Sequence, residues 1–153
     1  MLILLTILTG IVAGLRTMIA PAAVTWGAYL GLLDISQSSL SFMGSIWAVV
    51  IFTALAIVEL ITDQLASTPS RKVPMQFGAR IGMGALSGAT IAATGGIVVV
   101  GLVAGVIGAI VGTFGGASGR AYLANRLGRD LPAALVEDAV AIVLALLIIG
   151  TVS

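Results

Sequence analysis

The stretch that decides the fold is residues 1–31, which read MLILLTILTGIVAGLRTMIAPAAVTWGAYLG. Arg16 stands in the middle of this hydrophobic stretch, and Pro21 follows shortly after it. A charge at bilayer depth costs at least about 2.5 kcal/mol on insertion scales, and proline removes a helical hydrogen bond. Because an uninterrupted membrane helix has little use for either residue, the pair predicts a first segment that is broken or re-entrant near Arg16–Pro21.

The composition indicates an integral membrane protein. Hydrophobic residues make up 59% of the chain and charged residues 8%, whereas charged residues are about 25% of a soluble domain. Since lipid offers no water to exposed backbone groups, we expect an all-α, polytopic transmembrane helix bundle. The 153 residues allow one domain, residues 1–153, with roughly four to six spans of about 20 residues each.

The same composition excludes several classes of function. The net charge of +1 gives no reason to expect nucleic acid as a partner. The chain has no Cys and no His, which removes disulfides, thiol catalysis, His-based metal sites and imidazole acid–base chemistry. We therefore expect no enzyme, no cofactor and no metal site.

Hydropathy favours about five spans. The apolar segments lie at residues 2–30, 44–65, 80–94, 97–119 and 132–152. The apolar run from Ile81 to Gly116 is too long for one span, and Thr94-Gly95-Gly96 is the best place for it to turn.

Basic residues indicate the orientation in a bacterial inner membrane. They cluster after the second and fourth spans, which places loops 66–80 and 120–131 in the cytoplasm; the residues are Arg71, Lys72, Arg80, Arg120, Arg126 and Arg129. If the first segment crosses the membrane once, the N-terminus is inside. If the segment is a re-entrant hairpin, the N-terminus is outside, and the sequence leaves both alternatives open.

Glycines at helical spacing indicate close helix packing. Small-xxx-small (GxxxG) registers such as Gly101/Gly105, Gly108/Gly112 and Gly112/Gly116 let helix backbones approach each other. They are explained either by packing inside one chain or by a dimer face, and for a chain of this size we expect a homo-oligomer, most simply a homodimer.

A few charged residues are candidates for chemistry. Glu59 and Asp63 share one face of the second span, and Glu137 near the start of the fifth span can point inward. We expect these coupling or gating carboxylates to form a polar cluster with Arg80, Arg120 and Arg16. Asp138 is explained by the favourable helix dipole at the start of its span. The cluster is explained equally well as a network that only holds the fold.

Around Arg16, Gly14, Thr17 and Pro21 supply what a broken helix needs: freedom, a hydroxyl and a stop to the hydrogen-bond ladder. Helix N-termini and an arginine fork both bind anions, so the expected ligand-binding residues are Arg16, Thr17, Pro21, Arg80 and Arg120. The alternative is a proline-kinked helix in which Arg16 snorkels to the membrane surface or pairs with Glu59.

Four stretches resemble a bacterial family of small membrane proteins, the domain of unknown function 4126. They are AGLRTMIAPAAV at 13–24, ALAIVELITDQLASTPSR at 54–71, GARIGMGALSGA at 78–89 and LVEDAVAI at 135–142. The resemblance implies a multi-pass bacterial membrane fold and carries no substrate. The chain is also loosely similar to re-entrant, arginine-containing lipid-carrier transporters.

The leading hypothesis is a small membrane transporter or lipid-carrier flippase that binds an anionic small molecule or lipid phosphate at Arg16, with membrane lipids as its other partners. The first alternative is an ion channel lined by the glycine-rich helices. The second is a non-transporting scaffold or assembly protein. An intramembrane enzyme ranks last, because it would need the carboxylates to meet face to face.

Overall fold

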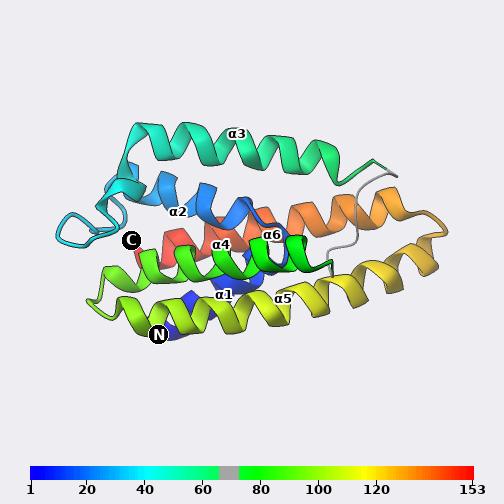
Figure 1. Cartoon of the computed structure of the whole chain (residues 1–153). Helices are drawn as coiled ribbons and strands as arrows, with labels where there is room; N and C mark the ends of the chain where they lie inside the picture. The colour runs from blue at the N-terminus through cyan, green and yellow to red at the C-terminus, as the bar shows by residue number, and fades with distance from the viewer. Residues whose placement is uncertain (66–72) are drawn as a thin grey trace.

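The computed structural model describes residues 1–65 and 73–153. Over these ranges the chain is all-helical, with one 3-10 turn and no strand (Figure 1). The elements are α1 (Leu2–Leu15), α2 (Ile19–Tyr29), η1 (Ser41–Gly44), α3 (Ile46–Thr62), α4 (Pro74–Ala93), α5 (Val98–Leu127) and α6 (Asp130–Val152).

Two of these helices, α5 and α6, are long and apolar enough to cross a membrane by length and composition. α1 and α3 are apolar but shorter. The five spans expected from hydropathy are therefore not matched one to one. The expected turn at Thr94-Gly95-Gly96 is present, because α4 ends at Ala93 and α5 begins at Val98. The segment expected at 80–94 belongs to a helix that already begins at Pro74.

The first segment is a helical hairpin. α1 ends at Leu15, Arg16 is extended with φ −137° and ψ 114°, and α2 begins at Ile19. Leu2 lies against Gly95, and Gly27 lies against Ile149, so both ends of the hairpin reach the end of the bundle where α6 finishes. In Figure 1, α2 runs back toward the end of the bundle at which α1 begins. The expected break near Arg16 is therefore present, and the segment folds back on itself as a hairpin.

Pro21 does not make the break. It is the third residue of α2, where its missing N–H removes no intrahelical hydrogen bond. The chain leaves the helical conformation at Arg16, before the proline. Pro21 thus fits the first turn of α2. The expectation that Pro21 stops a helix is wrong.

The glycines of α5 pack inside the chain. A Cβ on Gly105 would meet the backbone of Gly84 in α4, and a Cβ on Gly108 would meet the backbone of Ile7 in α1. Gly101 and Gly112 are similarly close to α4 and α1. α5 therefore holds α4 and the first hairpin arm at the close distance that glycine allows. For these glycines, packing within one chain is confirmed.

The bundle is apolar on its outside, and its interior combines a hydrophobic core with a set of buried polar residues. α3 exposes apolar side chains around most of its circumference, and α5 and α6 do so along their outer faces. The buried polar residues are Thr6, Thr9, Arg16, Thr17, Thr25, Arg80, Ser87, Thr90, Thr113, Glu137 and Asp138. This distribution is the one expected for a helical protein whose solvent is lipid.

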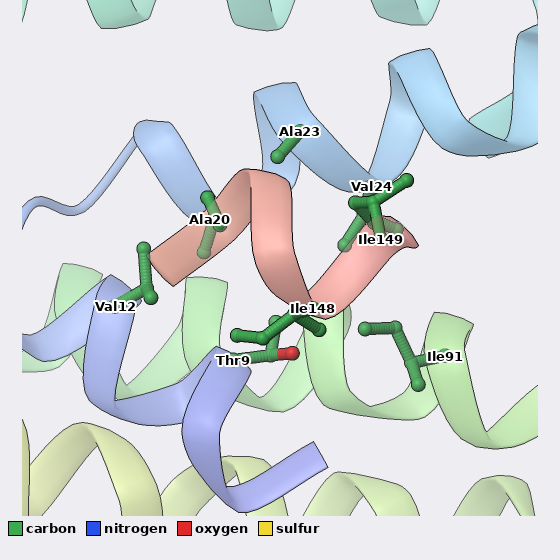
Figure 2. Close-up of a pocket in the computed structure, with 9 residues that line it drawn as sticks. Thr9, Val12, Ala20, Ala23, Val24, Ile91, Ile148 and Ile149 are labelled. Atoms are coloured by element: carbon green, nitrogen blue, oxygen red, sulfur yellow. The ribbon is translucent and has the colours of Figure 1, made fainter. Parts of the chain in front are cut away.

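Between the hairpin arms and α6 the packing is apolar and nearly without voids. Figure 2 shows side chains from α1, α2, α4 and α6 converging there; they are Thr9, Val12, Ala20, Ala23, Val24, Ile91, Ala145, Ile148 and Ile149. The space that they leave is about 10 Å³, at or below the volume that one water needs. We call these residues the apolar layer.

Candidate functional site

The break in the hairpin is capped from both sides by charged side chains of other helices. On the α2 side, the Glu59 carboxylate accepts hydrogen bonds from the backbone N–H groups of Thr17 (2.7 Å) and Met18 (2.8 Å). These N–H groups start a helix and have no intrahelical partner. The carboxylate therefore satisfies both donors and lies at the positive end of the helix dipole. α3 supplies this cap from near its own C-terminus.

On the α1 side, Arg80 of α4 performs the complementary role. Its Nη1 donates to the carbonyl oxygens of Gly14 (2.6 Å) and Leu15 (2.9 Å). These carbonyls end a helix, where a positive charge is favoured by the dipole. Arg80 is only 3% exposed. Both sets of free backbone groups at the break are thus bound by protein side chains of opposite charge.

Arg16 lies at the tip of the hairpin and is fully buried, with 0% of its surface exposed. Its guanidinium group forms ion pairs with Asp63 at the end of α3 and with Asp138 of α6. Its Nε has no hydrogen-bond partner among the described residues. Glu59 binds the backbone beside Arg16 instead of its side chain, so the expected Arg16–Glu59 pair is wrong.

Arg120 of α5 links the tip to the end of the bundle. Its Nε and Nη2 bind the two carboxylate oxygens of Asp130 at 2.9 and 2.6 Å. Nη2 also donates to the backbone carbonyl of Asp63 at 3.4 Å, and Nη1 lies 3.7 Å from a carboxylate oxygen of Glu137. Arg120 therefore lies in the expected polar cluster beside Glu137, and it also holds the end of α3.

We call this group the tip cluster. It brings three guanidinium groups together with four carboxylates, and Asp130 adds a fifth carboxylate at the exposed edge; the members are Arg16, Arg80, Arg120, Glu59, Asp63, Glu137 and Asp138. All the charged residues selected from the sequence belong to it. Thr17 contributes its backbone N–H, and Pro21 contributes to the helix start instead of the cluster.

Asp138 is the member that the sequence analysis missed. It was assigned to a helix N-terminus, but α6 begins at Asp130, so Asp138 lies two turns inside the helix, beyond the reach of the dipole. At 7% exposure and with an arginine partner, it is a functional candidate of the same standing as Asp63. The signal that was available is its position in an apolar helix, where a buried carboxylate needs a partner.

The depth of the tip cluster follows from helix geometry. Asp138 precedes the end of α6 at Val152 by about 21 Å at 1.5 Å per residue. Gly112, which packs against α1 close to the tip, follows the start of α5 at Val98 by about the same distance. The tip of the hairpin therefore lies about 21 Å along the bundle from the end at which α6 finishes.

In the described ranges, no group of three or more His, Cys, Asp or Glu side chains is arranged to hold a metal ion. Arg71 and Lys72, which indicate a cytoplasmic loop, lie outside the described residues.

Comparison with protein families, with curated proteins and with solved structures finds no match to this chain. Membership of the domain of unknown function 4126 therefore stays a prediction.

Proposed function

We propose that the chain is a multi-pass protein of the bacterial inner membrane in which α3, α4, α5 and α6 cross and the α1–α2 hairpin is re-entrant. The apolar outer surface and the buried polar residues support this placement. Exposed Trp26, Tyr29 and Trp47 lie toward one end of the bundle, where a membrane interface favours them. Arg120, Arg126 and Arg129 lie toward the opposite end, which we assign to the cytoplasm, with both termini outside.

Within this membrane protein, the tip cluster acts as a transport site for a phosphate- or carboxylate-bearing group. The observation that carries the proposal is the buried guanidinium of Arg16, which is held by carboxylates from two different helices at the point where a hairpin breaks. Arginine binds phosphate and carboxylate through a planar fork of donors. Asp63 and Asp138 occupy the places that the oxygen atoms of such a ligand would take.

The need to balance charge in a buried site couples binding of the anion to binding of a proton. An anion that binds Arg16 adds a negative charge to a buried site, which is costly unless a positive charge arrives with it. Protonation of Asp63 supplies that charge and weakens the hold of this carboxylate on Arg16. Each anion should therefore move together with a proton, and low pH should favour binding.

α3 is the element that moves in this mechanism. It packs mainly against α2 and η1, whereas α4, α5 and α1 pack tightly on one another. Three polar contacts hold its inner end: Glu59 to the α2 N-terminus, Asp63 to Arg16, and the Asp63 carbonyl to Arg120. Leu60 adds apolar packing against the core. When the Asp63 contact is lost, α3 can swing outward while the apolar layer keeps the outer half of the hairpin closed.

Transport is tested in vesicles of bacterial lipid that contain the purified protein. One arm follows internal pH after an inward gradient of inorganic phosphate is applied, and the other follows the transbilayer movement of fluorescent phosphatidic acid. We expect activity in at least one arm, stronger at acidic pH and abolished by Arg16→Gln. Arg126→Gln, which changes an exposed arginine beside Tyr122, is the matched control.

Activity in neither arm, or equal activity of the Arg16→Gln variant, would overturn the proposal. Because Arg16→Gln leaves buried carboxylates unpaired and can damage the fold, Asp63→Asn provides a second test. This variant imitates the protonated acid, so it should remain folded and lose the pH dependence of transport. A pH dependence equal to that of the unmodified protein would also count against the mechanism.

A static scaffold is the second candidate function. The complete burial of Arg16 among protein partners favours it, since buried ion pairs also specify structure without moving. Under this alternative, Asp63→Asn lowers stability and changes no flux. A channel has less support, because the packing of the apolar layer leaves space for no more than about one water.

A further inference from the structure

A groove beside the tip cluster has the properties of a lipid site. It has a volume of about 290 Å³ and is bounded by α1, α5 and α6. Its walls are aliphatic, part of its floor is glycine, and its charged lining residues are Arg120 and Glu137. Gly115 and Gly119 on the floor have no atom near the position of an added Cβ. The groove is therefore an apolar trough with Arg120 and Glu137 at its charged edge.

The depth of the groove matches the inner leaflet of the membrane. Counted from the start of α5 at Val98, Gly112 lies about 21 Å along the helix axis and Arg120 about 33 Å. Since the hydrocarbon core is about 30 Å thick, Gly112 and Gly115, at about 21 and 26 Å, lie at the depth of lipid tails. Gly119, at about 32 Å, and Arg120 lie at the depth of inner headgroups, where an acyl chain begins. A free anion would use only the charged edge, whereas a lipid uses both parts.

Arg120 already holds an anion in the arrangement that a lipid phosphate needs. Its Nε and Nη2 grip the two oxygens of the Asp130 carboxylate, which is the bidentate geometry in which arginine also binds phosphate. The Asp130 side chain is 64% exposed, so water and salt screen its attraction to Arg120 more than they would for a buried pair. A phosphate arriving from the headgroup layer can therefore compete with Asp130 for Arg120.

We propose that this groove binds an anionic phospholipid of the inner leaflet, with one acyl chain over Gly115 and Gly119 and its phosphate on Arg120 in exchange for Asp130. The proposal rests on the membrane placement proposed above and not on transport, because lipid can occupy the groove whether or not Arg16 carries a substrate. If the Arg16 site also transports lipid, that lipid binds in the groove before it reaches Arg16.

The test is electron paramagnetic resonance of spin-labelled phosphatidic acid and phosphatidylcholine in vesicles that contain the full chain. The measured quantity is the motionally restricted fraction of each label. We expect an excess of restricted phosphatidic acid, which the double variant Gly115→Leu/Gly119→Leu removes by filling the trough. Gly78→Leu/Gly82→Leu on α4 is the matched control, because an added Cβ there also meets no atom within 4 Å.

Two charge variants make the test specific for the headgroup. Arg120→Gln should reduce the preference for phosphatidic acid severalfold, and Asp130→Asn should increase it because the competing carboxylate is neutralised. Arg126→Gln, which changes an exposed arginine that does not line the groove, should leave the preference unchanged. Equal restriction of the two lipids, equal loss in the α4 control, or a preference that falls in Asp130→Asn would overturn the proposal.

Discussion

From the two ion pairs of Arg16 we predict how charge variants change the free energy of unfolding. Replacing either Asp63 or Asp138 by Asn removes one charge partner and leaves the other. Interactions with a buried charge contribute about 1.5–3 kcal/mol each, so each single variant should lower the free energy of unfolding by that amount. The double variant leaves Arg16 as a buried charge without a carboxylate partner from either helix, which costs at least about 3–5 kcal/mol.

The decisive variant then removes the arginine as well. Adding Arg16→Met to the double variant replaces the ionic triad by neutral groups, and such replacements are often neutral or stabilising. It should therefore recover most of the lost free energy. The assay is denaturant titration in mixed micelles, followed by tryptophan fluorescence.

Asp34→Asn is the control for this series. Asp34 is an exposed loop acid that bonds only locally, to Ser36, so its replacement should change the free energy by less than about 0.5 kcal/mol. If the triple variant is no more stable than the double variant, the ion pairs do not hold the tip as described.

Three further predictions concern the hairpin and its packing. Glu59→Ala should cost about 2–6 kcal/mol, because it leaves two buried N–H groups unsatisfied, and Glu59→Gln, which keeps one acceptor, should cost less in the same titration. Gly105→Ala should prevent close packing of α4 on α5, whereas Gly82→Ala, in open space, should be neutral or stabilise by up to about 1 kcal/mol; thermal unfolding in detergent compares them. Single cysteines at Ser153 and Gly128 should react with a membrane-impermeant maleimide from opposite sides of intact cells, and labelling from the same side would refute the proposed topology.

The sequence was sufficient to locate the break and most of the charged cluster. An arginine inside an apolar run is costly wherever it lies, so Arg16 and the few acids able to balance it were identifiable from residue type alone. The sequence could not show which acid pairs with which arginine, because the pairing depends on how far α3 and α6 extend past the tip of the hairpin. Glu59 and Asp63 share one helix face, and only the position of the α2 N-terminus decides which of them meets backbone and which meets Arg16.

The sequence also could not decide whether the first segment is a kinked single helix or a hairpin. A hairpin and a kinked span have the same hydropathy, and Pro21 suited either one. What distinguishes them is long-range packing, in which Leu2 meets Gly95 and Gly27 meets Ile149. Asp138 was missed for a related reason, because the start of α6 was placed at residue 132 and the acid then lay within the first turns of the helix.

The most direct test of the account is the distance between α3 and α6 in lipid. Spin labels at Ile61 and Leu135, both exposed, can be placed specifically because the chain has no native cysteine. We predict a single distance at neutral pH, and a second, longer distance when phosphate is added at acidic pH or when Asp63→Asn is introduced. A distance distribution that stays the same under all three conditions would contradict the release of Asp63 from Arg16.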